Sequence, residues 1–272
     1  MSIKFIELFA GIGGFRLGLK KASNFTCVYA NEFNKYAAQI YNERFKDEID
    51  TRDIREVKAE EIPDFELLTA GFPCQAFSIA GKRGGFEDTR GTLFFEIARI
   101  AKQKQPRLLL LENVKGLLSH DKGKTFGTIL NTLDELGYDC QWQVLNSKDF
   151  GVPQNRERVF IVGHLRGTSR PEVFPIGEIN KGVSKQKGGV RTEIRNSRKG
   201  GNKSNYNKSL LETILNRPIR IRRLTPTECE RLQGFPDGWT GGISDTQRYK
   251  CLGNAVTANV ITAIGNKLKE SK

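Results

Sequence analysis

Histidine is scarce in this sequence, and the two that occur, His120 and His164, lie far apart in the chain. Catalysis built on a Ser-His or Cys-His pair therefore has little material to use. The five cysteines, at positions 27, 74, 140, 229 and 251, are odd in number, scattered and free of any C-x-x-C pair. The sequence thus argues against a disulfide framework and against a zinc site, and we expect no metal.

Long apolar runs are also absent. No stretch approaches the ~18 residues that a membrane span needs, and the N-terminus lacks the charged-then-apolar layout of a signal peptide. We therefore expect a cytoplasmic protein that does not bind a membrane. The 272 residues, 38% of them hydrophobic, fit one large domain or one domain with a small appendage.

Positive charge is abundant and unevenly placed. The chain carries a net charge of +13, and residues 164–222 hold 14 Lys and Arg against four Glu. This Gly-, Asn- and Ser-rich stretch is either a solvated insert or a surface that contacts phosphates. A nucleic-acid partner is the simplest explanation of the imbalance, because Lys and Arg release counterions from a polyanion.

The first 165 residues alternate between strand and helix patterns, which predicts a doubly wound α/β fold. The unbroken apolar run 108–111 is typical of a strand covered on both faces. We expect a catalytic and cofactor-binding domain over 1–165, a small basic domain over 166–247 and a C-terminal helix within 248–272 that returns to the first domain. The expected strands are 3–9, 25–30, 67–70, 108–111, 141–145 and 159–165, and the expected helices are 15–20, 36–45, 93–101, 125–136, 225–232 and 255–268.

A glycine-rich turn, Phe9-Ala10-Gly11-Ile12-Gly13-Gly14, follows the first predicted strand. Its glycines allow a ligand to approach the backbone at a helix N-terminus, although the spacing is not the G-x-G-x-x-G of dinucleotide-binding turns. Glu32 ends the second strand, where such folds place a carboxylate on ribose hydroxyls. Asp53-Ile54 offers a polar group and an apolar wall for an adenine ring. Together these residues indicate an adenosine pocket.

Cys74 follows a short core strand in the run Gly71-Phe72-Pro73-Cys74. A free cysteine is most often a small buried hydrophobe. Here, however, the preceding glycine breaks the strand and Pro73 fixes φ just before the thiol. The side chain is therefore expected at the C-terminal edge of the sheet, where open α/β folds bind their ligands.

Three further charged residues are expected at the same edge. Glu112 ends the strand that contains 108–111, and burial in a dry pocket keeps such a carboxyl protonated, so that it donates a hydrogen bond. Its other reading is a helix cap or a salt-bridged loop acid. Arg156 and Arg158 lead into a strand, where charged residues are unusual unless they are paired with each other, with Glu157 or with a ligand.

These motifs, in this order, resemble the cytosine-C5 DNA methyltransferases of the bacterial and phage restriction-modification type. The resemblance covers residues 3–163 and 223–265. It rests on Glu-Leu-Phe-Ala-Gly-x-Gly-Gly, Pro-Cys-Gln, Glu-Asn-Val, Gln-x-Arg-x-Arg and a late Gly-Asn-Ala-Val, and it extends to Asp88-Thr89-Arg90-Gly91 and to Gln233-Gly234-Phe235-Pro236. It implies a Rossmann-like sheet that uses S-adenosylmethionine, a small target-recognition domain and DNA methylation.

The resemblance also implies residue roles. Cys74 would add to C6 of a flipped-out cytosine in double-stranded DNA, Glu112 would bond the N3 and amino edge, and Arg158 would contact O2 with support from Arg156. The glycine-rich segment 76–93 would be a mobile flap. Residues 9, 11, 12, 14, 32, 33, 53, 54, 73, 93, 254 and 256 (Phe9, Gly11, Ile12, Gly14, Glu32, Phe33, Asp53, Ile54, Pro73, Leu93, Asn254 and Val256) would contact the cofactor, and Gln75, Ser78, Lys82, Arg83 and Arg90 would contact DNA.

One departure from the family concerns the region between the Arg158 strand and Leu224, which is short for target recognition. We expect a monomer, and recognition is compact, reduced or completed by another chain. Three other functions stay open: methylation of transfer RNA, DNA binding without catalysis, and nicotinamide-dependent oxidoreduction. The last is disfavoured because the glycine spacing is wrong and Cys74 would have no purpose.

Overall fold

The structure is a computed structural model that describes residues 2–73, 93–177 and 222–269. Contacts divide the chain into one compact unit of residues 1–180 with 226–272 and a second unit of residues 181–225. The larger unit thus includes residues 166–180 and 226–247, which the sequence analysis assigned to the small domain. No described helix combines the length and apolar character needed to cross a bilayer.

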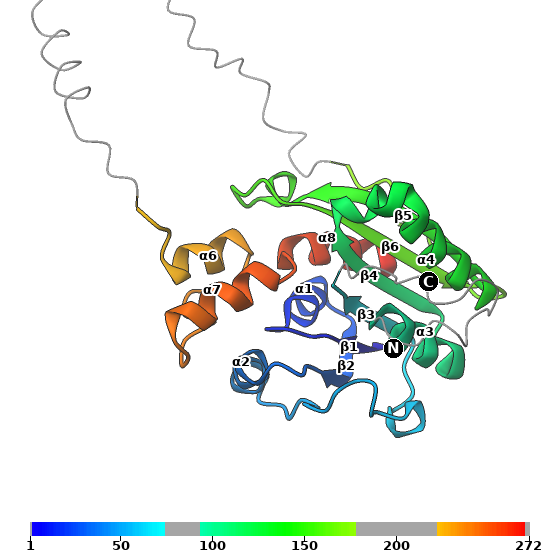
Figure 1. Ribbon diagram of the computed structural model, residues 1–272, viewed down its shortest axis with the longest axis horizontal. Coiled ribbons are helices and arrows are strands. Elements are labelled where there is room, and N and C mark those ends of the chain that lie inside the picture. The colour runs from blue at the N-terminus through cyan, green and yellow to red at the C-terminus, as the bar shows by residue number, and fades with distance from the viewer. Residues whose placement is uncertain (1, 74–92, 178–221, 270–272) are drawn as a thin grey trace, which may run out of the picture. The chain divides into compact units, whose positions relative to one another are not determined.

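One sheet of six strands forms the centre of the larger unit (Figure 1). Its order is β2-β1-β3-β4-β6-β5, and β6 runs antiparallel to both of its neighbours while β1 to β4 are parallel. The strands are β1 (Ile3–Leu8), β2 (Phe25–Asn31), β3 (Leu67–Gly71), β4 (Leu108–Val114), β5 (Tyr138–Asn146) and β6 (Glu157–Leu165).

Helices cover both faces of this sheet, which confirms the α/β fold expected from the sequence. Along β4, Leu109 and Leu111 pack toward α3 and α4, whereas Leu108 and Leu110 pack toward α1 and α8. The side chains of a strand alternate between its faces, so an unbroken leucine run is buried on both sides. The helices are α1 (Gly14–Ala22), α2 (Lys35–Phe45), α3 (Leu93–Lys104), α4 (Lys124–Glu135), α6 (Pro226–Leu232), α7 (Asp245–Asn254) and α8 (Ala258–Lys269), with 3-10 turns η1 (Ala59–Glu61), η3 (Lys115–Leu118), η4 (His120–Gly123) and η5 (Ser147–Phe150).

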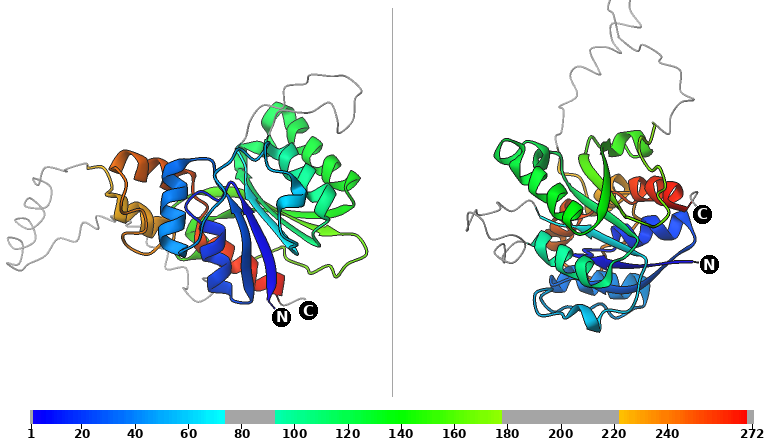
Figure 2. Two further views of the ribbon diagram at one scale, coloured as in Figure 1. Left: turned by 90° about the horizontal axis from the view of Figure 1, so that it is seen from below. Right: turned by 90° about the vertical axis from the view of Figure 1, so that its right-hand side faces the viewer.

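The helix predicted over 255–268 is α8, and a further helix that the sequence pattern did not predict, α7, precedes it. Helix α7 ends at Asn254 because Ala255 adopts an extended backbone (φ −67°, ψ 148°), and α8 begins at Ala258. Helix α7 contacts both α2 and α6, and the pair α6 and α7 lies away from α4 (Figure 2). Arg44 of α2 donates hydrogen bonds to the carbonyls of Trp239 (2.6 Å) and Gly238 (2.7 Å), which fastens the α6–α7 connection to the first half of the chain.

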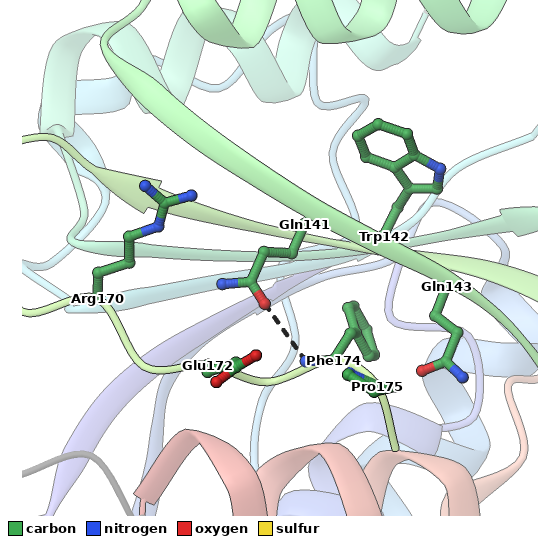
Figure 3. A pocket seen from close by; sticks show the side chains of 7 residues that line it. All are labelled: Gln141, Trp142, Gln143, Arg170, Glu172, Phe174 and Pro175. Atoms are coloured by element: carbon green, nitrogen blue, oxygen red, sulfur yellow. Dashed lines mark hydrogen bonds between the residues drawn. The ribbon is translucent and has the colours of Figure 1, made fainter. Parts of the chain in front are cut away.

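The segment after β6 returns along edge strand β5 (Figure 3). Gln141 and Gln143 point toward this segment, and their side-chain amides bond its backbone. Gln141 accepts from the amides of Val173 (3.2 Å) and Phe174 (3.3 Å), and Gln143 accepts from the amide of Ile176 (2.9 Å). Two glutamines on one face of β5 thus fasten this segment to the sheet.

Glu7 of β1 is a fully buried acid beneath the glycine-rich turn. Its Oε2 accepts a hydrogen bond from the Tyr41 hydroxyl (3.2 Å), and its Oε1 has no partner among the described residues. Burial raises the pKa of Glu7 from 4.5 to about 8, although the Arg16 guanidinium and the Tyr41 hydroxyl oppose this shift. The folded chain therefore keeps a proton on Glu7 at pH values where the unfolded chain has lost it.

This retained proton predicts a pH-dependent stability. Since the folded pKa lies above the unfolded one, Glu7 lowers the free energy of unfolding as pH rises from about 4.5 to about 8. The Glu7→Gln variant lacks this loss. Its free energy of unfolding, measured relative to the wild type, should therefore increase by roughly 4 kcal/mol as pH rises from the lower to the upper of these values. Urea unfolding at both ends of the range measures the gain. A difference in free energy of unfolding between variant and wild type that is the same at both pH values would contradict the raised pKa of Glu7. Replacement of an exposed acid, Glu48→Gln, serves as the control.

Candidate active site

A cavity of about 410 Å³ opens at the C-terminal ends of β1, β3 and β4. Open parallel sheets bind their ligands at this edge, outside the carboxyl ends of the strands. Ten of the residues singled out in the sequence line this one cavity: Phe9, Gly11, Glu32, Phe33, Pro73, Leu93, Glu112, Arg156, Arg158 and Asn254. The sequence motifs, which are up to 245 positions apart, therefore meet in one place.

The glycine-rich turn forms one wall of the cavity. Gly13 has φ +83° at the N-cap of α1, and a Cβ there would lie 2.2 Å from the Phe45 ring. A Cβ on Gly14 would lie 2.7 Å from Val256, so the helix start packs directly on the α7–α8 connection. Only glycine permits this backbone and this packing together. The turn thus brings the first and last parts of the chain into contact.

Glu32 links the glycine-rich turn to the start of α2. Its two carboxylate oxygens accept hydrogen bonds from the amides of Gly11 (2.8 Å) and Asn34 (2.7 Å). Burial raises the pKa of Glu32, while these two amides oppose the shift. Beside it, Phe33 is 71% exposed, unlike the core phenylalanines. The site therefore presents a carboxylate and a free aromatic face to the cavity, a pair suited to a sugar and a flat heterocycle.

Glu112 and Arg158 form an ion pair at the other end of the cavity. Arg158 Nε lies 3.0 Å from Glu112 Oε1, and their side chains are only 21% and 11% exposed. The pair follows from register, because Arg158 of antiparallel β6 opposes Val114, two positions after Glu112 on β4, and is therefore its diagonal neighbour. Burial raises the pKa of Glu112, whereas the positive charges of Arg158 and Arg156 oppose this. The carboxyl can therefore hold a proton more readily than a solvated one.

Arg156 lines the same cavity but bonds elsewhere. Its Nη2 donates to the carbonyls of Gly253 (3.1 Å) and Ala255 (2.8 Å), on either side of Asn254. Burial lowers the pKa of Arg156 to about 10, and the nearby positive charge of Arg158 acts in the same direction. Arg156 therefore fixes the α7–α8 connection in the cavity wall, a role that the sequence did not indicate.

Phe72 and Pro73 lead from β3 toward position 74. The carbonyl of Phe72 accepts a hydrogen bond from Asn113 Nδ2 (2.8 Å), and the Phe72 ring lies 5.6 Å from the Phe94 ring of α3. Pro73 is exposed and lines the cavity. The backbone that precedes Cys74 is thus anchored beside Glu112.

Four of the residues expected to contact the cofactor are buried or paired away from the cavity lining. Ile12 is in the core, and its carbonyl accepts from Trp239 Nε1 (2.9 Å). Asp53 pairs with Arg55, whose guanidinium lowers the pKa of Asp53 to about 2. Ile54 packs in the core against α3, and Val256 packs on Gly14. Gly14 is a fifth residue that was expected to contact the cofactor and does not line the cavity.

Six of the expected residues lie outside the described part of the chain: Cys74, Gln75, Ser78, Lys82, Arg83 and Arg90, together with the rest of the predicted flap. The lining contains residues that the sequence analysis did not select, among them Asn34, Ala37, Asn113, Lys250, Cys251 and Gly253. Asn34 carried a usable signal, because it follows Glu32-Phe33 and caps α2 by accepting from the amides of Tyr36 (3.0 Å) and Ala37 (3.2 Å).

The fold is Rossmann-like, and its cavity lies at the edge of the sheet where enzymes of this fold bind their ligands. More narrowly, the chain belongs to the family of C-5 cytosine-specific DNA methylases, whose model matches residues 3–215 and 174–270. Type II methyltransferase M1.ScrFI of Lactococcus lactis subsp. cremoris is 42% identical, over 98% of this chain and 78% of the relative. Type II methyltransferase M.HhaI of Haemophilus parahaemolyticus is 37% identical, over 99% and 95%. The expected class of enzyme, a DNA cytosine-5-methyltransferase, is confirmed.

Solved structures agree on the fold. The S. pombe Dnmt2 methyltransferase covers 98% of this chain and 99% of its own, with a TM-score of 0.72 at 20% identity. A putative DNA modification methyltransferase from an E. coli prophage matches with a TM-score of 0.66 at 19% identity, over 99% of each chain. The alignment with M1.ScrFI occupies 304 positions, more than the 272 residues of this chain, so the relative carries residues that this chain lacks.

Proposed function

We propose that this enzyme methylates C5 of a flipped-out cytosine in double-stranded DNA through a transient bond between Cys74 and C6. The observation that carries the proposal is the buried Glu112–Arg158 ion pair, which lies in the same cavity as Pro73, the residue that precedes the thiol. An acid whose pKa is raised by burial and a fixed guanidinium match the hydrogen-bonding edge of a pyrimidine.

The thiolate has a definite chemical task in this proposal. Its electron pair forms the S–C6 bond, and the π electrons of the C5–C6 bond make C5 nucleophilic. After methylation, loss of the C5 proton to a base returns an electron pair to the ring, and the S–C6 bond breaks. Cys74 is regenerated, so the residue acts as a covalent catalyst and no external reductant or oxidant is needed.

We assign Glu112 and Arg158 to binding of the target cytosine. A protonated Glu112 donates to N3 of the cytosine and stabilises the charge that accumulates on the ring. Arg158 donates to O2 and, through its 3.0 Å contact with Glu112, holds the carboxyl in place. Because C6 of a stacked base is out of reach, the cytosine must leave the duplex to enter the cavity.

The opposite end of the cavity is assigned to S-adenosylmethionine, the cofactor that the family and the fold imply. This cofactor supplies an electrophilic methyl group when it is bound. The residues present fit an adenosine, because Glu32 offers a carboxylate for ribose hydroxyls and the 71% exposed Phe33 offers a ring to stack on. Phe9, Gly11, Pro73, Leu93 and Asn254 complete the proposed lining, and the resemblance adds Ile12, Gly14, Asp53, Ile54 and Val256.

Contacts with DNA are assigned to Gln75, Ser78, Lys82, Arg83 and Arg90 and to a small recognition domain within 166–247. We further propose that the enzyme acts as a cytoplasmic monomer, since DNA in the cell is its substrate. A partner chain is required only if the short recognition region reads no sequence by itself.

The Lys- and Arg-rich residues 164–222 should contribute to DNA affinity. Replacing Lys181, Lys185, Lys187 and Arg191 with glutamine removes up to four phosphate contacts, so the slope of log Kd against log salt should fall by up to about 3.6. Fluorescence anisotropy with a labelled duplex, at salt concentrations from about 50 to about 200 mM, measures this slope. An unchanged slope would show that this segment is a solvated insert. Matched replacement of Lys4, Lys20, Lys35 and Lys46 provides the control.

Transfer of labelled methyl groups from S-adenosylmethionine to randomised duplex DNA tests the function directly. We expect 5-methylcytosine in a defined sequence context, read by deep sequencing. Methylation of transfer RNA but not of duplex DNA would support the transfer-RNA alternative. Duplex binding without any methylation would identify a catalytically silent relative.

A further inference from the structure

Asn113 occupies the point where β3 and β4 separate. The last paired residues of the two strands are Gly71 and Glu112. One position further, the side chain of Asn113, and not its backbone, connects the two chain segments. Its Nδ2 donates to the carbonyl of Phe72 at 2.8 Å, and the side chain is buried, with Asn113 2% exposed. A side chain thus holds the backbone of β3 where strand pairing has ended.

The orientation of this amide is fixed by a second bond. Asn113 Oδ1 accepts from the amide of Val114 at 2.8 Å, so exchanging its oxygen and nitrogen would break both contacts. Pro73 has no N–H, and it therefore has no amide with which to continue the ladder. Within residues 72–73, where the described part of this turn ends, the carbonyl of Phe72 is thus attached to β4 through Asn113.

The aromatic ring of Phe72 gives a second anchor of a different kind. It packs on the Phe94 ring of α3 with centroids 5.6 Å apart, and Phe94 packs on Phe95 at 5.4 Å. These contacts fix the side chain in the core, while Asn113 fixes the direction of the peptide. Losing the Asn113 side chain therefore leaves Phe72 buried and frees the carbonyl that precedes Pro73, together with the amide of Val114.

We propose that Asn113 is a positioning residue that sets the separation between Cys74 and Glu112. It follows Glu112 directly in the chain, and it grips the peptide two residues before the thiol. Any rotation of that peptide moves position 74 relative to the carboxyl that bonds the same base. The inference rests on the proposed role of Cys74, and it assigns to Asn113 no contact with substrate or cofactor.

The expected effect is on the chemical step. A displacement of the attacking atom by about 1 Å costs on the order of 10²-fold in rate. Asn113→Ala should therefore lower kcat, and the single-turnover rate of adduct formation with duplex DNA that contains 5-fluorocytosine, by about 10²-fold. The KM for DNA and the affinity for S-adenosylhomocysteine should change little, because Glu32 and Phe33 are untouched. Asn113→Ser, which retains a shorter hydroxyl donor, should fall between the alanine variant and the wild type.

Thr69→Val provides a matched control on the same sheet. Thr69 of β3 is fully buried, and its hydroxyl donates to the carbonyl of Ile6 at 2.9 Å. This substitution preserves shape and removes one buried side-chain-to-backbone bond, where Asn113→Ala removes two, and it leaves the Phe72 peptide attached. It should lower the unfolding temperature as Asn113→Ala does, with kcat and the adduct rate near the wild-type values.

The outcomes separate this inference from the proposed function. If the wild type forms no adduct and transfers no methyl group, the role of Cys74 fails. If the wild type forms the adduct and Asn113→Ala matches Thr69→Val in kcat and adduct rate, only the role of Asn113 fails. A loss of S-adenosylhomocysteine affinity as large as the loss of rate would also overturn it, since Asn113 would then support the whole cavity.

Discussion

Replacing Cys74 with serine is expected to abolish methyl transfer, with a loss of at least about 10³-fold in kcat. A serine hydroxyl does not ionise near neutral pH and is a poor nucleophile toward C6, whereas a thiol reaches its reactive anion readily. The affinity for S-adenosylhomocysteine should remain near the wild-type value, because the proposed cofactor end of the cavity is built from other residues, including Glu32 and Phe33. Labelled methyl transfer and calorimetric titration measure the two quantities.

Cys140→Ser is the matched control for this experiment. Cys140 is a free, half-buried cysteine on β5 and does not line the active-site cavity. The control should retain the wild-type rate. Turnover of Cys74→Ser within about tenfold of the wild type would remove the nucleophile assignment.

Changing Glu112 to glutamine is expected to lower kcat by about 10²- to 10⁴-fold and to reshape its pH dependence. Burial raises the pKa of Glu112, and the charge of Arg158 holds that rise in check. The protonated carboxyl is the proposed donor, so kcat should fall as pH rises through the pKa of the folded enzyme. Glutamine does not titrate, and the alkaline fall that belongs to Glu112 should disappear in the variant.

The Arg158→Met variant gives the opposite change in the same profile. Removing the guanidinium removes the interaction that favours the ionised carboxylate, so the pKa of Glu112 should rise further and the alkaline fall should move to higher pH. Its kcat should also drop, because the contact with O2 is lost. An alkaline fall at the wild-type pH in both variants would show that another group causes it.

Much of the fold was predictable from pattern. The run 108–111 predicted a strand covered on both faces, and β4 is packed on both. The glycine-rich turn predicted a helix N-terminus at a ligand edge, and α1 begins there. Helix α7 was not predictable, because only Cys251 and Leu252 of its residues are buried and no apolar periodicity marks it.

The candidate site was predictable where a residue acts through its own strand position. Glu112 reached the cavity because it lies near the C-terminal end of buried strand β4, and Glu32 did so because it directly follows β2. Arg156 was expected to support Arg158, and both line the cavity. However, β6 begins at Glu157, so Arg156 precedes the alternation and bonds two carbonyls of the α7–α8 connection. Such partners depend on tertiary contacts that spacing does not encode.

Asn113 also has a role that depends on tertiary contacts, although its motif is visible in the sequence. Its identity belongs to the Glu-Asn-Val motif, yet its task follows from the end of the β3–β4 ladder and from the lack of an N–H in Pro73. Neither the register nor the ladder end is visible in the sequence. Asp53 and Ile54 illustrate the converse, since a plausible polar and apolar pair is engaged by Arg55 and by the core.

The most direct measurement is covalent capture on duplex DNA whose target cytosine carries fluorine at C5. Fluorine replaces the proton that must leave, so the enzyme cannot release itself after methyl transfer. The account predicts a denaturation-resistant complex that forms only with S-adenosylmethionine and maps by peptide sequencing to Cys74. A complex that maps to another residue, or none in an enzyme that methylates ordinary DNA, would contradict it.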